Sequence, residues 1–155
     1  MFISAESFDE IMARILVGGP EGKYQDTHDS LVARLKLEHE VTYIKNDGQG
    51  MFWELAKTPL IAKEQRYDLV IYDSDLFYPE ATPEKKIECF EMLTAKYLAS
   101  AQASVIILAE MNLAMKLQPL VKKVGFSQID EPYHLDRAIY KITEILRIRA
   151  GSDVK

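Results

Sequence analysis

The chain has 155 residues, of which 48% are hydrophobic and 28% are charged, and its formal net charge at pH 7 is −5. This length and composition are typical of one globular domain that buries a core without cross-links. The acidic balance argues against nucleic acid as a main partner, because phosphate binding needs clustered basic residues. A single cysteine, Cys89, excludes an internal disulfide and a cysteine-based metal cluster.

Membrane and secretion signals are not expected in this sequence. No apolar run approaches the ~20 residues that a membrane-spanning helix needs. The first residues are acidic rather than basic and then apolar, so they do not read as a secretion signal. A cytoplasmic location is therefore the expectation.

The predicted elements begin with a short helix over about residues 7–12, where Ser7 and Glu10 have the spacing of a capping box. Residues 1–13 are expected to be an N-terminal extension, residues 14–150 one domain, and residues 151–155 a tail. Apolar runs then predict buried strands at residues 14–17, 39–45, 67–73, 104–109 and 126–129. Gly18, Gly19 and Pro20 are expected to end the first of them.

Helical spacing of apolar residues predicts helices between these strands, over about residues 26–37, 51–59, 83–100, 113–124 and 135–146. Thr82 and Pro83 form a typical helix start, and Gly125 a typical helix end. Alternating strands and helices predict an α/β fold with a parallel sheet and right-handed crossovers. Five such units fit a flavodoxin-like, doubly wound sheet with strand order 2-1-3-4-5 and helices on both faces.

Asp73 is the first candidate for function. It ends the β-branched run of the central strand, and chemistry in such sheets gathers at the carboxyl edge. It could take part in chemistry there, or be a carboxylate capped by backbone N–H groups.

Four segments in order carry a family resemblance: residues 46–48 (Asn-Asp-Gly), 68–76 (DLVIYDSDL), 105–108 (VIIL) and 125–133 (GFSQIDEPY). Over roughly residues 14–149 the chain resembles the receiver domain of two-component response regulators. The resemblance implies a domain that receives a phosphoryl group in a phosphorelay, at the position of Asp73, and that commonly pairs through its last helices.

The residues that support phosphorylation in that family are changed here. Gly18 and Gly19 stand where the family places two acids for Mg²⁺, Ala109 where it places Thr or Ser, and Glu131 where it places Lys. Gln128 stands at the position of an aromatic switch residue. Phosphoryl transfer needs positive charge against the developing oxyanions, and Mg²⁺ needs several oxygen ligands. The sequence therefore resembles a pseudo-receiver that uses no cofactor, with at most weak Mg²⁺ binding.

Four acids leave an alternative open at this edge. Asp75, Glu21, Glu110 and Glu131 follow strand ends and could form an acidic pocket beside Asp73, or they could be solvated loop acids. The segment from Gly18 to Lys23 matches no phosphate-binding motif and is interpreted as a strand-to-helix turn. The three histidines, His28, His39 and His134, occupy surface-like positions without metal-ligand spacing or a triad partner.

These observations predict a non-enzymatic signalling domain that is independent of phosphorylation and binds a protein partner. A homodimer through the last two helices is expected. Three alternatives remain: a phospho-accepting regulator that uses Asp73 with an atypical set of acids, a small flavodoxin-like protein that binds a nucleotide or flavin at residues 18–22, and a part of a larger regulator with a separate output domain.

Overall fold

The structure, a computed structural model, describes residues 12–20, 25–46, 65–73, 82–91, 98–99 and 102–153. The helices predicted over residues 7–12 and 51–59 fall outside these ranges, apart from Met12. None of the helices in the described ranges is both long and apolar enough to span a bilayer.

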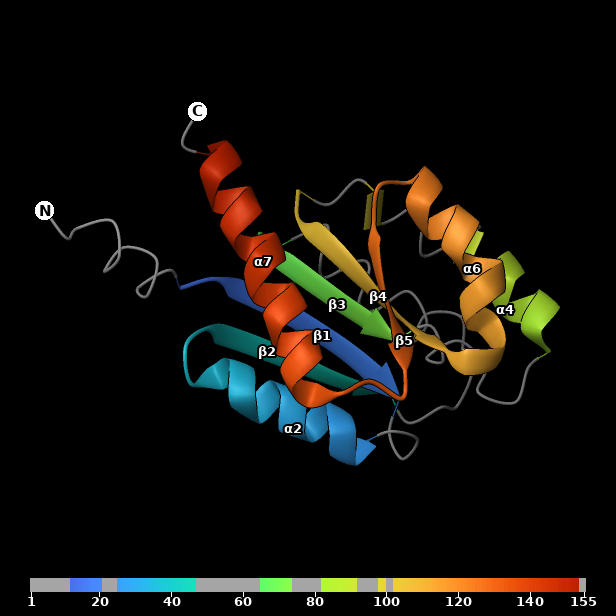
Figure 1. Ribbon diagram of the computed structural model, residues 1–155, viewed down its shortest axis with the longest axis horizontal. Coiled ribbons are helices and arrows are strands. Elements are labelled where there is room, and N and C mark those ends of the chain that lie inside the picture. Colours follow the sequence, from blue (N-terminus) through green and yellow to red (C-terminus); the bar gives the residue numbers. More distant parts are fainter. Residues whose placement is uncertain are drawn as a thin grey trace, which may run out of the picture.

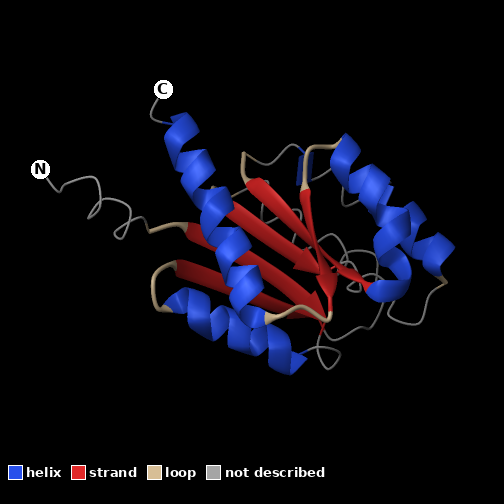
Figure 2. Ribbon diagram, in the orientation of Figure 1, coloured by secondary structure: helices blue, strands red, loops and turns tan. Residues whose placement is uncertain are grey.

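Five parallel strands form one sheet in the order β2-β1-β3-β4-β5 (Figures 1 and 2), which confirms the predicted fold class. The strands are β1 (Arg14–Pro20), β2 (Glu40–Asn46), β3 (Leu69–Asp73), β4 (Ser104–Glu110) and β5 (Ser127–Glu131). The predicted end of the first strand at residue 17 is wrong, because Gly18 and Gly19 continue it and pair in register with Ile44 and Lys45 of β2.

The described helices are α2 (Gln25–Lys36), α4 (Pro83–Cys89), α6 (Met111–Lys123) and α7 (Leu135–Asp153). The Thr82 side chain accepts a hydrogen bond from the Lys85 N–H and so caps α4, as its position predicts. Gly125 follows α6 with φ +81°, a conformation that favours glycine. The last helix runs to Asp153, three residues into the segment predicted to be a tail.

Among the described residues, two helices cover each face of the sheet. In Figure 1, α2 and α7 lie side by side over the near face. There Leu31, Val32 and Leu35 of α2, with Ala138, Ile142 and Leu146 of α7, pack on strand residues such as Ile15 and Ile71. The next strand residue along, for example Leu16 or Tyr72, points to the other face and packs against α4 and α6. This alternation gives two apolar layers, and it leaves the strand ends as the places for polar side chains.

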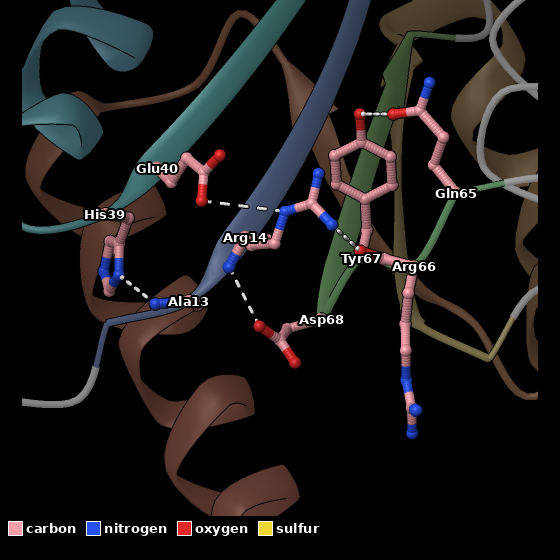
Figure 3. Close-up of polar contacts among 8 residues, drawn as sticks. All are labelled: Ala13, Arg14, His39, Glu40, Gln65, Arg66, Tyr67 and Asp68. Atoms are coloured by element: carbon pink, nitrogen blue, oxygen red, sulfur yellow. Dashed lines mark hydrogen bonds and ion pairs between the residues drawn. The ribbon is translucent and has the colours of Figure 1, made fainter.

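A polar cluster fixes the amino ends of the strands (Figure 3). The Arg14 backbone N–H donates to Asp68 Oδ2 over 2.8 Å, and the Arg14 Nη1 donates to the Arg66 carbonyl oxygen over 2.8 Å. His39 Nδ1 accepts the Ala13 N–H over 3.1 Å. These contacts join β1 to the starts of β2 and β3, so this edge has a structural role and the functional candidates lie at the opposite edge.

Candidate functional site: a buried histidine between two carboxylates

Asp73 is the last residue of β3, and its side chain is completely buried. The strand places it at the carboxyl edge of the sheet, as the sequence predicts. It is not capped only by the local backbone, because its Oδ2 lies 2.6 Å from Nε2 of His28. A carboxylate oxygen accepts this hydrogen bond, so Nε2 carries the hydrogen.

His28 comes from the fourth residue of α2 and is also completely buried. Its other ring nitrogen, Nδ1, lies 3.0 Å from the hydroxyl of Tyr133, and that hydroxyl lies 3.5 Å from the Thr27 carbonyl oxygen. The two rings are nearly parallel, with 15° between their planes. The imidazole is therefore fixed at both nitrogens. The prediction from the sequence that His28 lies at the surface is wrong.

Glu131 ends β5 and closes the cluster, with only 2% of its surface exposed. Its Oε2 lies 3.2 Å from His28 Nε2, an ion-pair distance. Because the single Nε2 hydrogen is directed at Asp73, neither carboxylate oxygen of Glu131 has a hydrogen-bond partner among the described residues. The site thus consists of one imidazole between two buried carboxyl groups.

The charges of this cluster follow from its burial and its contacts. Burial lowers the pKa of His28, but the hydrogen bonds and charges of Asp73 and Glu131 outweigh burial and raise that pKa from 6.5 to about 9. Burial raises the pKa of Glu131, His28 lowers it and the charge of Asp73 raises it, with a net result of about 8. The neighbouring carboxyl groups therefore favour the imidazolium form of His28, whereas burial favours the protonated form of Glu131.

Two expectations about charge are corrected by this arrangement. The sequence predicted an Asp73 that has lost its positive neighbour, whereas His28 supplies a cation at 2.6 Å. The sequence also predicted that Glu131 brings a negative charge into the site, whereas burial raises the pKa of this carboxyl group and so works against that charge. Both corrections have the same cause, because burial and close contact set the protonation of these groups.

The glycine at position 19 leaves room for the imidazole. A Cβ atom at Gly19 would lie 3.0 Å from His28 Cδ2, which is closer than nearly all real contacts of this kind. Gly18 and Gly19 therefore lie within β1, with Gly19 beside the ring of His28, and not in a turn that cradles an anion.

The predicted acidic pocket forms only in part. Of its four acids, Glu131 lies beside Asp73, whereas Glu110 pairs with the buried Lys86 of α4 at 3.4 Å. Asp75 and Glu21 lie outside the described residues. The sequence left open an acidic pocket or solvated loop acids, and neither describes Glu131 fully. Its side chain is buried, and it lies beside a histidine as well as an aspartate.

Ala109 and Gln128, the other two residues that differ from the receiver-domain pattern, lie in β4 and β5. Ala109 is fully buried and pairs in register with Asp130, so the end of β4 offers no hydroxyl at that position. Gln128 donates hydrogen bonds to the Ala114 carbonyl oxygen and to Asp130 Oδ1, which tie β5 to α6. An amide held in this way is a structural link between an edge strand and a helix.

Sequence reasoning missed His28, although the spacing of its helix contained the signal. His28, Leu31 and Leu35 follow the i, i+3, i+7 pattern of one helix face, and the structure buries all three. The other two histidines differ: His39 is half-buried and accepts a backbone hydrogen bond, and His134 is exposed as expected.

Chemically, the arrangement is poorly suited to nucleophilic attack by Asp73. The carboxylate is buried, and the oxygen nearest His28 accepts a short charge-assisted hydrogen bond that lowers its nucleophilicity. The same three side chains can instead offer ligands to a metal ion, because His28, Asp73 and Glu131 each present a donor atom and these atoms lie within 4.8 Å of one another.

Comparisons with known proteins identify the fold. No protein-family model and no curated protein sequence matches the chain. Among solved structures, it is similar to the signal receiver domain of a LuxO repressor protein from Vibrio parahaemolyticus, with 15% identity, a TM-score of 0.58, and coverage of 93% of this chain and 97% of that one.

Two further structures show the same likeness. One is the receiver domain of a sensor histidine kinase from Pseudomonas aeruginosa PAO1 with a magnesium ion in its active-site cleft, at 14% identity and TM-score 0.55, covering 88% of this chain and 98% of that one. The other is a streptococcal redox sensor described as evolved from two-component response regulators, at 19% identity and TM-score 0.59. The match covers 90% of this chain but 53% of that sensor. The chain therefore has the fold of response-regulator receiver domains.

Proposed function

We propose that this chain is a receiver-like signalling domain that works without phosphorylation and acts by binding another protein. One observation carries the proposal: the carboxylate at the phosphoacceptor position, Asp73, is buried and hydrogen-bonded to His28 over 2.6 Å. A phosphodonor would have to displace a buried ion pair before it could reach this oxygen, which is costly.

The groups that would stabilise a phosphoryl oxygen are also replaced. Ala109 offers no hydroxyl at the end of β4, and Gly18 and Gly19 offer no carboxylates to Mg²⁺ at the end of β1. The His28 imidazole is already paired with Asp73, so these positions offer little further positive charge to offset the charge that phosphoryl transfer develops. The streptococcal redox sensors, described as evolved from response regulators, support the idea that this fold can signal by other means.

The surface proposed for partner binding surrounds the edge strand β5. Figure 1 shows α6 and α7 on either side of this strand. Met111 and Met115 of α6 and Tyr140 of α7 are large apolar side chains exposed to solvent. A groove of about 370 Å³ between β5 and α7 is lined by residues that include Gln128, Tyr133, Arg137 and Lys141. Apolar anchors beside a groove with polar walls are typical of protein-binding surfaces.

The proposed partner is a protein of a signalling pathway, or a second copy of the chain bound through the β5 edge. The proposal assigns no catalytic activity to the domain and places it in the cytoplasm. Its core claim, independence from phosphorylation, rests on Asp73 and does not depend on which protein binds.

The test is incubation of the full chain with acetyl phosphate and Mg²⁺, followed by intact-mass measurement. We expect no added phosphoryl group, whereas the magnesium-binding receiver domain from Pseudomonas aeruginosa serves as the positive control under the same conditions. The variant Asp73→Asn serves as the matched negative control. A phosphoryl adduct on the natural chain that is absent from Asp73→Asn would overturn the proposal and support a phospho-accepting regulator.

A further inference from the structure

We propose that His28, Asp73 and Glu131 bind one divalent transition-metal ion, with Zn²⁺ preferred. Each residue comes from a different element, α2, β3 and β5, and the three meet at the carboxyl edge of the sheet. The metal site would exist whether or not the domain acts through a protein partner.

The spacing of the donor atoms is suitable for a tetrahedral ion. His28 Nε2 lies 2.6 Å from Asp73 Oδ2 and 3.2 Å from Glu131 Oε2. With zinc–ligand bonds of about 2.0–2.1 Å, ligand atoms in a tetrahedron lie about 3.3 Å apart. The His28–Asp73 separation would therefore have to widen by about 0.7 Å and the His28–Glu131 separation by about 0.1 Å to fit around an ion, with the fourth position left for water.

Glu131 supplies an independent indication of a ligand. Its side chain is buried, faces His28 at 3.2 Å, and has no hydrogen-bond partner for either oxygen among the described residues. A buried acceptor without a partner costs free energy, so such groups call for a ligand or another explanation. A metal ion bound to Oε2 would satisfy this carboxylate directly.

The charges of the three donors also match a divalent ion. Metal binding would release the Nε2 proton of His28 and any proton held by Glu131. The neutral imidazole and two carboxylates that remain carry a total charge of −2, which one divalent cation offsets in a site where burial weakens solvation. The metal ion would thus replace the hydrogen that now lies between the ring and the carboxylates.

The contacts behind the imidazole are those of a metal-binding histidine. When Nε2 binds a metal, Nδ1 carries the hydrogen and donates it to the Tyr133 hydroxyl, 3.0 Å away. That hydroxyl in turn faces the Thr27 carbonyl oxygen. Such outer contacts fix the tautomer and the ring orientation of metal-binding histidines. Tyr133 is therefore a positioning residue for the site.

The donor set also selects among metals. Imidazole nitrogen suits Zn²⁺ and related transition metals, whereas Mg²⁺ prefers oxygen ligands and retains several waters. This site differs from the weak Mg²⁺ site considered from the sequence, because it uses the His28 imidazole and needs no acid at Gly18 or Gly19.

The experiment is calorimetric titration of the full, untagged chain, stripped with EDTA, using ZnCl₂, MnCl₂ and MgCl₂ separately. We expect one Zn²⁺ per chain, weaker binding of Mn²⁺ and the weakest binding of Mg²⁺. Glu131→Gln and His28→Gln should each weaken Zn²⁺ binding by at least about tenfold. The matched controls His39→Gln and His134→Gln, which change the other two histidines, should leave the affinity unchanged.

Thermal unfolding keeps the test independent of any loss of structure in the variants. Glutamine has nearly the shape of a protonated glutamate, so Glu131→Gln should stay folded, and Zn²⁺ should raise the Tm of the natural chain but not of this variant. Absence of Zn²⁺ binding, or binding that survives both Glu131→Gln and His28→Gln, would overturn the proposal. Phosphorylation of Asp73 would refute the proposed function, but Zn²⁺ binding measured on the unphosphorylated chain would still stand.

Discussion

Gly19 and His28 are fitted to each other: the imidazole occupies the space into which any side chain at position 19 would project, with only 3.0 Å between His28 Cδ2 and a Cβ placed at Gly19. The ring carries the site's positive charge. Gly19, which has no side chain, therefore affects how well the site can form by leaving room for the ring. By the resemblance described above, receiver domains place acids at the positions of Gly18 and Gly19. An acidic side chain at position 19 would compete with the His28 imidazole for the same space.

The substitution Gly19→Ala should lower the free energy of unfolding by about 1–3 kcal/mol, the usual cost of overpacking. The cost arises because His28 is held by Asp73 and Tyr133 and has little freedom to move. Urea denaturation measures it. In a His28→Ala background the same substitution should be close to neutral, and an equal loss in both backgrounds would show that the ring is not the cause.

Asp73→Asn should destabilise the protein by about 3 kcal/mol, because it removes one partner of a buried ion pair and leaves the imidazolium without its counter-charge. Combined with His28→Gln, the loss should be smaller than the sum of the two single losses by more than about 1 kcal/mol. Denaturant midpoints of the four proteins give this coupling energy. Simple additivity would mean that the pair at 2.6 Å contributes nothing as a pair.

The stability of the metal-free protein should fall as the pH rises. Folding raises the pKa of Glu131 from 4.5 to about 8 and the pKa of His28 from 6.5 to about 9. A group with a raised pKa binds more protons in the folded state, so it stabilises the fold most at low pH. The contribution of Glu131 to the free energy of unfolding is complete below pH 4.5 and is lost towards pH 8. The contribution of His28 is complete below pH 6.5 and is lost towards pH 9.

Denaturation in EDTA across this pH range checks the sign. Relative to the natural chain, Glu131→Gln should gain more than about 1 kcal/mol between the two ends of its window, the equivalent of less than one pKa unit. The variant His134→Gln, at an exposed histidine away from the site, serves as the control. A natural chain that becomes more stable relative to Glu131→Gln at higher pH would contradict the assignment.

A homodimer through the β5 edge should be broken by a charge placed among its exposed apolar residues. Met115 is 85% exposed and Tyr140 is 70% exposed. Met115→Asp and Tyr140→Asp should each shift the mass measured by light scattering at tens of micromolar protein from dimer to monomer, because a stable interface desolvates such residues. Leu37→Asp is the control, since Leu37 is equally exposed but follows α2. A natural chain that is monomeric would contradict the prediction.

The fold could be predicted because its signals are local. Apolar runs mark the buried parallel strands, Thr82 and Gly125 mark a helix start and a helix end, and strict alternation leads to the strand order. The end of β1 was predicted wrongly because glycine usually interrupts strands, whereas Gly18 and Gly19 are held in the ladder by β2.

The site could be predicted only in part, because its charges depend on contacts between distant residues. Asp73 was located correctly from its place at a strand end. His28 was missed because histidine on a helix is usually exposed, and its partners lie 45 residues further on at Asp73 and beyond at Glu131. The raised pKa of Glu131 follows from its burial, which sequence spacing does not reveal.

The crowding between position 19 and the imidazole also constrains how this edge packs. A protein with histidine at position 28 and a side chain at position 19 would have a Cβ only 3.0 Å from the ring, so the ring or the strand would have to shift by a few tenths of an ångström. The absence of a side chain at position 19 is therefore what lets the imidazole pack closely against β1.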